Sequence, residues 1–320
     1  MKVLVSGVTG MFGTALSREL SEDGHEITTL SRSKPSSEDT VRWDPSRGEV
    51  DVARLEGHDA VVHLAGESLT GVPWSPEKKA RIMDSRVSGT RLLSEAIASL
   101  SEPPGVMVSV SGLNYYGSRG NELLREDSGP GSGFLAEVCR EWEQAADPAR
   151  EAGVRVVHPR FGIVFPQGFY LNLAGLEVGV MHPKFEISLG AGGNTLARIP
   201  AFKLTGGGWI GSGSQYWSWS VIDEVAGVIM HALMTDSLHG PVNAVPDPVT
   251  AREYTATLNR VLNRPTVFPL PAPLARLALG DFADEMLLAS IRADSTRLKE
   301  SGYRFRYPDL ESALRHLLGR

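Results

Sequence analysis

Three glycines near the start of the chain have the spacing of a loop that holds a dinucleotide. They follow an apolar run from Val3 to Ser6 and precede a helical stretch from Thr14 to Leu20. Glycines allow a tight turn and let the backbone approach a pyrophosphate, while a helix N-terminus presents free N–H groups to the phosphates. In this strand-to-helix context the pattern predicts a phosphate site rather than an ordinary glycine turn. The candidate contacts are Gly7, Thr9, Gly10, Met11, Phe12 and Gly13.

The end of the second predicted strand indicates which dinucleotide is bound. A site for NAD usually places an acidic residue roughly 20 residues beyond the loop, where it binds the ribose 2′-hydroxyl. This chain instead reads Leu30-Ser31-Arg32-Ser33-Lys34. A guanidinium and an ammonium suit a 2′-phosphate. We therefore predict NADP(H), with Ser31 and Arg32 as contacts; the alternative is a solvated basic turn.

Further candidate contacts follow the strand that ends at His63. Small residues there would let the backbone pass close to the adenine and ribose of the cofactor, although a glycine at a strand end is often only a turn. The candidates for cofactor binding in this group are Leu64, Ala65, Gly66 and Glu67, to which we add the two cations Arg86 and Arg160.

Several tryptophans are candidates for the substrate pocket. Trp74, Trp217 and Trp219, together with Arg86, could form an aromatic and partly cationic wall for a planar or anionic substrate. The simplest alternative is that these side chains pack between the domains. The sequence alone leaves both open.

With these motifs in place, the chain resembles the extended or atypical short-chain dehydrogenase/reductases. Within them it is similar to the epimerase-like subfamily, of the NAD-dependent epimerase/dehydratase family, with a C-terminal domain of unknown function. The resemblance covers nearly the whole chain and implies a Rossmann-type fold with a nicotinamide cofactor. It rests on Gly7 to Gly13, Leu64 to Glu67, Trp74, Ser85-Arg86, Tyr115 to Gly117, Arg160 to Val164, Gly211 to Gly213, Gln215 to Trp219, Asp223 and a tail from Leu270 to Leu314.

The resemblance implies chemistry less firmly, because a catalytic pair is missing. In relatives of known mechanism a Tyr and a Lys four residues later share a helix face, and the Lys lowers the pKa of the Tyr so that it can move a proton. When Glu143 is taken as the helix landmark, these two positions are Leu135 and Cys139, and neither can replace the pair. The superfamily's catalytic Ser is retained as Ser111, whose alternative role is to satisfy the strand-end backbone.

Two tyrosines that follow Ser111 are the nearby phenols that could replace the lost acid. They are Tyr115 and Tyr116; the alternative is that they pack over the nicotinamide ribose or line the pocket. The chain departs from the subfamily twice more. Val221 stands where a His commonly precedes the Ile-Asp pair, and the stretch around residues 169–192 is longer than expected.

The elements that must position these residues are short β-branched runs that alternate with amphipathic helices, as expected for a parallel sheet built from βαβ units. We predict helices over Pro76 to Leu100 and Phe134 to Ala152. The fold class is α/β, a Rossmann-type doubly wound parallel sheet with a smaller, intimately packed C-terminal α/β substrate region. The predicted strands are Val3 to Ser6, Glu26 to Leu30, Ala60 to His63, Val106 to Ser111 and Val154 to His158.

The predicted organisation has two parts that share one interface. Residues 1–165 form the NADP-binding Rossmann domain, and residues 166–320 form the substrate region. Within the second part we expect an irregular flap at residues 169–194, because long loops in compact domains are usually lids or mobile segments. A helical tail covers residues 270–320.

The bulk composition excludes several classes of protein. The 320 residues are 42% hydrophobic and 22% charged, as in globular proteins, and the net charge of −6 gives no general attraction to nucleic acid or an acidic membrane. One cysteine cannot form an internal disulfide, and no Cys/His cluster has the spacing of a structural zinc site. Without a signal segment or a membrane-spanning apolar run, we expect a cytoplasmic protein with no metal, no nucleic-acid partner and no membrane.

The leading hypothesis from the sequence is an NADP(H)-dependent oxidoreductase or epimerase-like enzyme acting on a small substrate. The rival is a non-catalytic NADP(H)-binding sensor or regulatory protein, which the loss of the Tyr/Lys pair favours. A true nucleotide-sugar epimerase is a weaker third reading, because that reaction needs acid/base groups. The sequence indicates neither the substrate, the reaction direction nor the oligomeric state.

Overall fold

The computed structural model describes residues 1–33, 37–70, 72–166, 169–172, 177–180, 208–263 and 269–320. Its first half alternates strands and helices, as predicted. These elements are β1 (Lys2–Ser6), α1 (Met11–Glu22), β2 (Glu26–Ser31), β3 (Thr40–Asp44), β4 (Glu49–Val50), β5 (Ala60–His63), α2 (Pro76–Ala98), β6 (Val106–Ser109), β7 (Ser111–Gly112), β8 (Leu123–Leu124), α3 (Phe134–Gln144), α4 (Asp147–Glu151) and β9 (Arg155–Phe161).

The second half contains shorter elements. Its strands are β10 (Ile163–Phe165), β11 (Phe169–Asn172), β12 (Glu177–Val180), β13 (Tyr216–Trp217), β14 (Trp219–Val221), β15 (Gly240–Asn243), β16 (Val249–Thr250) and β17 (Arg292–Ala293). Its helices are α6 (Ile222–Met234), α7 (Ala251–Leu262), α8 (Ala272–Leu279), α9 (Thr296–Glu300) and α10 (Leu310–Leu318). In the part of the chain that the structure describes, no helix has the length and apolar character needed to cross a membrane.

The main sheet is a doubly wound Rossmann-type sheet, which confirms the predicted fold class. Its strand order is β15-β9-β6-β5-β1-β2-β3-β4, with β7 also paired to β9, and every pairing is parallel except that of β3 with β4. The chain direction across the sheet reverses between β1 and β5. Ligands bind at such a switch point, beyond the carboxyl ends of the strands.

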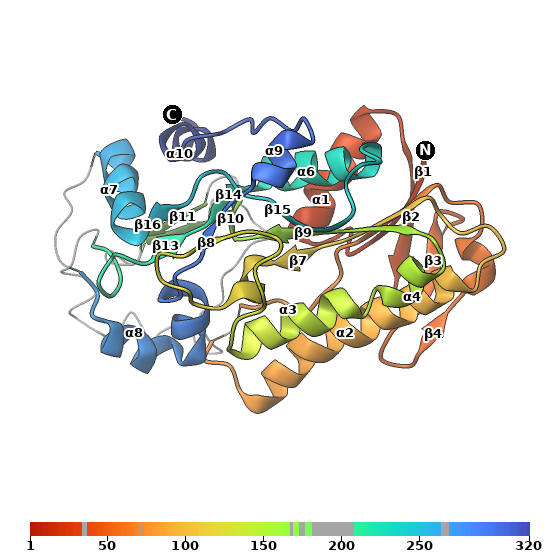
Figure 1. Ribbon diagram of the computed structural model, residues 1–320, viewed down its shortest axis with the longest axis horizontal. Helices are drawn as coiled ribbons and strands as arrows, with labels where there is room; N and C mark the ends of the chain where they lie inside the picture. Colours follow the sequence, from red (N-terminus) through yellow and green to blue (C-terminus); the bar gives the residue numbers. More distant parts are fainter. Residues whose placement is uncertain (34–36, 71, 167–168, 173–176, 181–207, 264–268) are drawn as a thin grey trace.

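Successive residues of β1 face opposite sides of the sheet and build two separate cores. Val3 and Val5 pack with α1 and α6, whereas Leu4 packs on the other side with residues of α2. Figure 1 shows the resulting three layers, with α1 and α6 on one face of the sheet and α2, α3 and α4 on the other. Because both faces are covered, the central strands are continuous apolar runs.

The structure corrects two of the predicted elements. The predicted helix from Phe134 to Ala152 is two helices, α3 and α4, because Pro148 in the first turn of α4 has no N–H to continue the hydrogen bonds of α3. The predicted irregular flap at 169–194 contains a hairpin, since β11 and β12 pair antiparallel. The other residues of that stretch lie outside the described residues, and its position at a substrate entrance stays a prediction.

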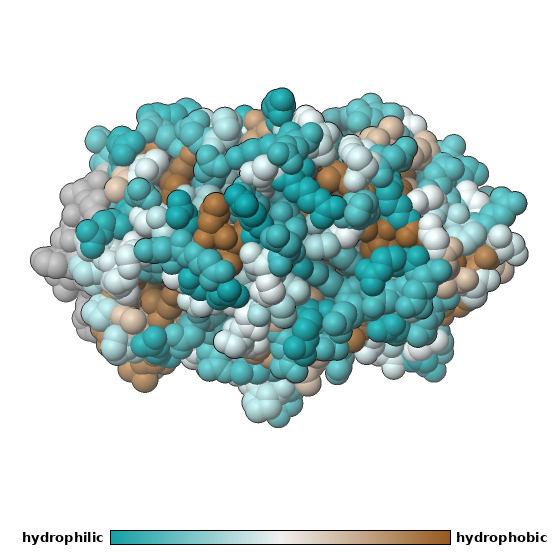
Figure 2. Space-filling model, in the orientation of Figure 1, coloured by the Kyte–Doolittle hydropathy of each residue, from teal (hydrophilic) through white to brown (hydrophobic). Residues whose placement is uncertain are grey.

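The chain beyond residue 165 also contributes to the main sheet, because β15 pairs with β9 and α6 packs against α1. The predicted domain boundary stays a prediction. A further core is formed around Phe165, Trp219 and Tyr254 by β10, β14, α7 and α10. On the face shown in Figure 2, hydrophobic residues form small separate areas among hydrophilic ones.

Candidate functional site

The glycine loop between β1 and α1 has a backbone path that only glycine permits at two positions. Gly7 has a φ of +74°, and a Cβ on Gly13 would lie 2.2 Å from the Gly7 carbonyl oxygen. The loop closes with a hydrogen bond of 3.0 Å from the Gly10 N–H to the Gly7 carbonyl. The loop therefore brings the first turn of α1 against the end of β1, which is the geometry of a phosphate cradle.

The N-terminus of α1 is open to an anion. The helix begins after Gly10, which provides no side-chain cap, and its first turn contains no acidic residue. The first N–H groups of a helix lack intrahelical partners and carry a partial positive charge. A phosphate group would accept hydrogen bonds from these N–H groups and neutralise the partial charge. The loop therefore fits the pyrophosphate of the predicted dinucleotide.

A serine at the end of β1 fixes the second predicted cofactor segment beside the loop. The Ser6 hydroxyl accepts hydrogen bonds from the N–H groups of Leu64 (3.0 Å) and Ala65 (3.2 Å) and also contacts His63 Nδ1 at 2.7 Å. A Cβ on Gly7 would lie 2.9 Å from the Leu64 carbonyl carbon. The residues from Leu64 onward thus follow the glycine loop closely, as the cofactor prediction requires.

Arg86 supports this segment from behind. Its guanidinium donates to the carbonyl oxygen of Glu67 at 3.0 Å and lies over the Trp142 ring, 5.1 Å from its centroid. Burial lowers the pKa of this guanidinium. Gly66 passes directly over it, because a Cβ there would lie 3.2 Å from the guanidinium carbon. These contacts make Arg86 a support for the cofactor segment.

The Glu67 side chain is engaged away from the loop. Its carboxylate accepts from Lys78 Nζ at 2.7 Å and lies 3.6 Å from Arg81. The hydrogen bond from Lys78 lowers the pKa of this carboxyl. Any contact of Glu67 with a cofactor would therefore come from its backbone.

Arg32 lies where the sequence placed a contact for the 2′-phosphate. It follows β2, next to the carboxyl end of β1, and its side chain is exposed. Its carbonyl accepts from Arg42, and the Ser31 hydroxyl accepts from the Ser33 N–H at 3.1 Å. In the described part of the chain no carboxylate pairs with the Arg32 guanidinium, which leaves it available to an anion. Lys34 lies outside the described residues.

A buried ion pair lies farther along the same edge of the sheet. Arg160, at the end of β9, makes two hydrogen bonds of 2.7 Å to the carboxylate of Glu143 on α3. The Ser111 hydroxyl donates to the same carboxylate at 2.7 Å. Ser111 and Arg160 are neighbours in the sheet, since β7 pairs with β9 at this position. Glu143 therefore joins two predicted site residues from two strands.

The environment of this pair keeps the arginine charged. The side chains of Arg160 and Glu143 are only 2% and 12% exposed. Burial by itself lowers the pKa of the Arg160 guanidinium, but the hydrogen bonds and charge of Glu143 outweigh burial and raise it above its ordinary value. A buried arginine in this state is a fixed positive charge. Its contacts within the protein are evidence for a structural role that the sequence did not predict.

The two tyrosines after β7 occupy different positions around Arg160. The Tyr116 hydroxyl accepts from Arg160 and donates to Asn243, each at 2.8 Å, and burial raises the pKa of Tyr116 to about 12. Tyr116 is fully buried, so its described contacts give it the role of holding Arg160. The ring of Tyr115 covers the guanidinium at 3.6 Å and is only half-buried. Tyr115 is therefore the phenol nearer to solvent.

Cys139 lies where the superfamily has its lysine, and the structure leaves it inert. Its thiol is buried beneath Gly112, where a Cβ would lie 3.3 Å from the sulfur. Burial, followed by the nearby charge of Glu143, raises the pKa of the thiol to about 12. A neutral thiol cannot supply the positive charge of a lysine.

The three tryptophans are buried, as the packing alternative expects. Trp219 is 1% exposed and belongs to the core around Phe165 and Tyr254. Trp74 makes edge contacts with the rings of Phe134 and Phe282. Trp217 belongs to the same core as Trp219 but also lines a pocket. Trp217 and Trp219 thus share one core and Trp74 lies in another, so the three do not form one wall.

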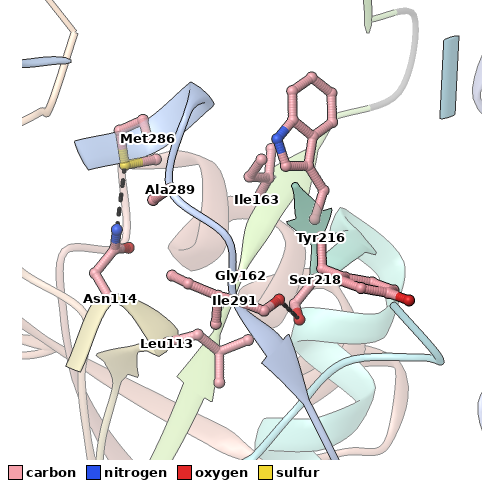
Figure 3. Close-up of a pocket in the computed structure, with 10 residues that line it drawn as sticks. Leu113, Asn114, Gly162, Ile163, Tyr216, Ser218, Met286, Ala289 and Ile291 are labelled. Atoms are coloured by element: carbon pink, nitrogen blue, oxygen red, sulfur yellow. Dashed lines mark hydrogen bonds between the residues drawn. The ribbon is translucent and has the colours of Figure 1, made fainter. Parts of the chain in front are cut away.

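A pocket opens just beyond the strands that carry Ser111 and Arg160. The atom-free space at this opening, open solvent included, is about 310 Å³, so this volume is not an enclosed one. Figure 3 shows the side chains gathered around it, with the Tyr216 ring extending away from Met286 and Ala289. Its lining residues are Leu113, Asn114, Gly162, Ile163, Tyr216, Trp217, Ser218, Met286, Ala289 and Ile291.

The structure therefore gathers the predicted residues into two groups at one sheet edge. The glycine loop, the segment after His63 and Arg32 form the first, and Ser111, Tyr115 and Arg160 form the second. Sequence reasoning missed Glu143 and Asn243 as members of the second group. A signal for Glu143 was present, because it lies one helical turn beyond Cys139 and so shares its face of α3.

Two family models match the chain. The NAD dependent epimerase/dehydratase family matches residues 3–167, and a domain of unknown function (DUF1731) matches residues 270–317. An epimerase family protein of Mycobacterium tuberculosis is 34% identical over 313 residues, which cover 98% of this chain and 96% of the relative.

Two solved structures with similar sequences share the fold. The crystal structure of the human epimerase family protein SDR39U1 with NADPH has a TM-score of 0.79 and 32% identity to this chain. The match covers 100% of this chain and 99% of the human chain. A nucleoside-diphosphate sugar epimerase from Corynebacterium glutamicum has a TM-score of 0.73 and 32% identity, and the match covers 100% of this chain and 58% of that one. The chain therefore shares its fold with relatives along its whole length.

Proposed function

The chain belongs to the NAD-dependent epimerase/dehydratase family, and we propose that it is an NADP(H)-dependent oxidoreductase acting on a small substrate. One observation carries the proposal: the glycine loop, Arg32 and the pocket all lie beyond the carboxyl ends of strands of one doubly wound sheet. The similar human protein was crystallised with NADPH, which supports the same cofactor here.

The residues of the first group fit this cofactor. The N–H groups of the loop and of the first turn of α1 would hold the pyrophosphate, with Gly13 allowing α1 to approach β1. Arg32 would form charged hydrogen bonds to the 2′-phosphate, which distinguishes NADP(H) from NAD(H). The backbone of Leu64 to Gly66 would lie along the adenosine. When bound, the nicotinamide ring supplies or accepts a hydride.

Ser111 and Glu143 can move the proton that accompanies hydride transfer. In the oxidation of an alcohol, the Ser111 oxygen would accept the substrate's hydroxyl proton as its own proton passes to Glu143, to which it already donates at 2.7 Å. In the reverse direction, the Ser111 hydroxyl would donate to the developing oxyanion. Arg160 would hold the Glu143 side chain in place between turnovers.

Tyr115 is the second candidate for contact with the reacting groups. Its ring covers the Arg160 guanidinium, and it is less buried than Tyr116. We assign Tyr116 to the support of Arg160, because its hydroxyl already donates to Asn243 and accepts from Arg160.

Transfer of deuterium tests this function directly. NADPH labelled with deuterium at the nicotinamide C4 is incubated with the protein and a panel of small carbonyl compounds, and the products are examined by mass spectrometry. The proposal expects an alcohol product that carries one deuterium, with oxidation of an equal amount of cofactor. NADPH that binds but transfers no deuterium to any compound would contradict it.

A non-catalytic NADP(H)-binding protein is the alternative that one observation favours. Ser111, Glu143, Arg160 and Tyr116 satisfy one another within the protein, as expected of a structural network. On this reading Ser111→Ala would leave cofactor affinity unchanged, and the labelled cofactor would be recovered intact.

A further inference from the structure

The pocket beside Ser111 has a lining that selects among substrates. Leu113 and Asn114 follow β7 directly, and Gly162 follows β9, so the pocket starts where these two strands end. This is the side of the switch point opposite β2 and Arg32. A dinucleotide that extends from the glycine loop past β5 would have its far end directed toward this pocket.

The lining of the pocket is apolar. None of the ten described residues that line it is charged, and five of its side chains are those of Leu, Ile, Ala or Met. Two polar groups of the lining are already bonded: the Ser218 hydroxyl donates to the Ile291 carbonyl and accepts from the Ala293 N–H, and the Trp217 indole N–H donates to the Leu287 carbonyl. Such a surface binds apolar groups and penalises an ion that must lose its water.

Asn114 provides an oriented polar contact. Its amide nitrogen donates to the Glu285 carbonyl at 2.8 Å and contacts the Met286 sulfur at 3.8 Å, which fixes the amide (Figure 3). Among the described residues its carbonyl oxygen has no partner. That oxygen can accept from one hydroxyl of a ligand.

The cations that lie around this region are directed elsewhere. The Arg292 guanidinium lies over the Tyr216 ring and donates to the Asn121 carbonyl. Arg252 lies over the Trp209 ring and donates to the Ser212 carbonyl. Neither lines the pocket, and no described helix of eight or more residues begins among its lining residues, so neither cationic side chains nor a helix N-terminus is available there for a diphosphate.

From this lining we propose that the substrate is a small uncharged carbonyl compound, or its alcohol, with an apolar body, and not a nucleotide sugar. The inference rests on the proposed function and deepens it. A nucleotide sugar would bring a diphosphate against described lining residues that carry no charge. A compact aromatic or aliphatic ketone or aldehyde would contact the same residues without leaving a buried ion unpaired.

A matched pair of ligands tests the substrate class. The protein with bound NADP⁺ is titrated by calorimetry with 4-methylbenzyl alcohol, with 4-(hydroxymethyl)benzoate, which has a carboxylate in place of the methyl group, and with UDP-glucose. We expect the neutral alcohol to bind at least tenfold more tightly than either anion. Equal binding, preference for an anion, or binding of none of the three would overturn the inference.

Variants locate the binding at this pocket. Ala289→Phe, at a lining side chain that is 9% exposed, should weaken binding of the neutral alcohol about tenfold while leaving NADPH affinity unchanged. Leu277→Phe, on a side chain that is 83% exposed on α8, serves as the control and should change neither. Equal affinity of both variants for the alcohol would place its site elsewhere and overturn the inference.

Turnover separates this inference from the proposed function. The aldehydes that correspond to the two alcohols are supplied with NADPH, and oxidation of the cofactor is followed. If the neutral alcohol binds selectively but no aldehyde is reduced, the proposed oxidoreductase function fails while the ligand class of the pocket stands. If the carboxylated aldehyde is reduced faster, the function stands and the ligand class is wrong.

Discussion

Replacement of Glu143 by glutamine should destabilise the protein strongly, because it leaves a buried guanidinium without its counter-charge. Glu143 makes two hydrogen bonds of 2.7 Å to Arg160, whose side chain is 2% exposed. The glutamine side chain keeps one acceptor oxygen, but its amide N–H group then faces an N–H group of the Arg160 guanidinium. Removing one partner of a buried ion pair typically costs about 3–5 kcal/mol.

The size of the chain converts this cost into a change in melting temperature. An unfolding entropy of roughly 2.1 cal/mol/K per residue over 320 residues gives about 0.7 kcal/mol for each degree. The melting temperature should therefore fall by roughly 4–8 °C, which differential scanning calorimetry can measure. Glu141→Gln is the matched control, because this carboxylate on the same helix is 39% exposed and pairs with Arg140 at the surface. Its replacement should cost less than about 0.5 kcal/mol.

A double variant shows whether the ion pair is responsible. Arg160→Met removes the positive charge, so adding it to Glu143→Gln should cost less than the sum of the two single changes, by about 0.5–3 kcal/mol. Strictly additive losses, or a melting temperature for Glu143→Gln equal to that of the Glu141→Gln control, would refute the reasoning.

Three further predictions follow from single residues. Gly13→Ala should weaken NADPH binding at least tenfold, about 1.4 kcal/mol, because its Cβ would lie 2.2 Å from the Gly7 carbonyl; the control Gly129→Ala, with open space at its Cβ, should bind normally in fluorescence titration. Ser111→Ala should slow reduction of a substrate by ~10²–10³ in steady-state assays, whereas Cys139→Ala should change the rate little; equal rates for both would remove Ser111 from the reaction. Burial lowers the pKa of His63 from 6.5 to about 4. Between these two pH values the imidazole is protonated in the unfolded chain but not in the folded protein, so the free energy of unfolding falls as the pH decreases from 6.5 to 4. The decrease amounts to about 3 kcal/mol. Denaturant titrations at pH 6.5 and pH 4 measure it, and His63→Asn should remove this share of the decrease; an equal decrease in the variant would show that His63 is not its source.

The cofactor loop could be predicted from the sequence because its determinants are local. Gly7, Gly10 and Gly13 lie within seven residues between a strand and a helix, and the structure places β1 and α1 on either side of them. The five predicted strands are present. Four of them are short runs with buried residues on both faces, whereas β2 is mostly half-buried, and the strand predicted from Val106 to Ser111 is divided into β6 and β7. The strand Ala60–His63 begins and ends where the sequence pattern indicated.

The network around Arg160 could not be predicted in this way, because its contacts join distant residues. Glu143 lies 17 residues from Arg160 and 32 from Ser111, and Tyr116 is bonded to Asn243 across 127 residues. The pairing depends on β7 and β15 flanking β9, which the periodicity of a single segment does not encode. For this reason the sequence assigned Arg160 to the cofactor and left Tyr116 open as an acid.

We expect the carboxyl edge of the sheet to bind NADP(H) through the glycine loop and Arg32, and a parallel titration tests this. NADPH and NADH are titrated into the native protein, Arg32→Asp and a control, Arg140→Asp, on the exposed surface of α3. Loss of a charged hydrogen bond is worth roughly 1.5–3 kcal/mol, or about tenfold or more in affinity. The native protein and the control should prefer NADPH by at least that factor, and Arg32→Asp should prefer NADH. Equal affinity of the native protein for both cofactors, or an unchanged preference in Arg32→Asp, would show that Arg32 does not bind the 2′-phosphate.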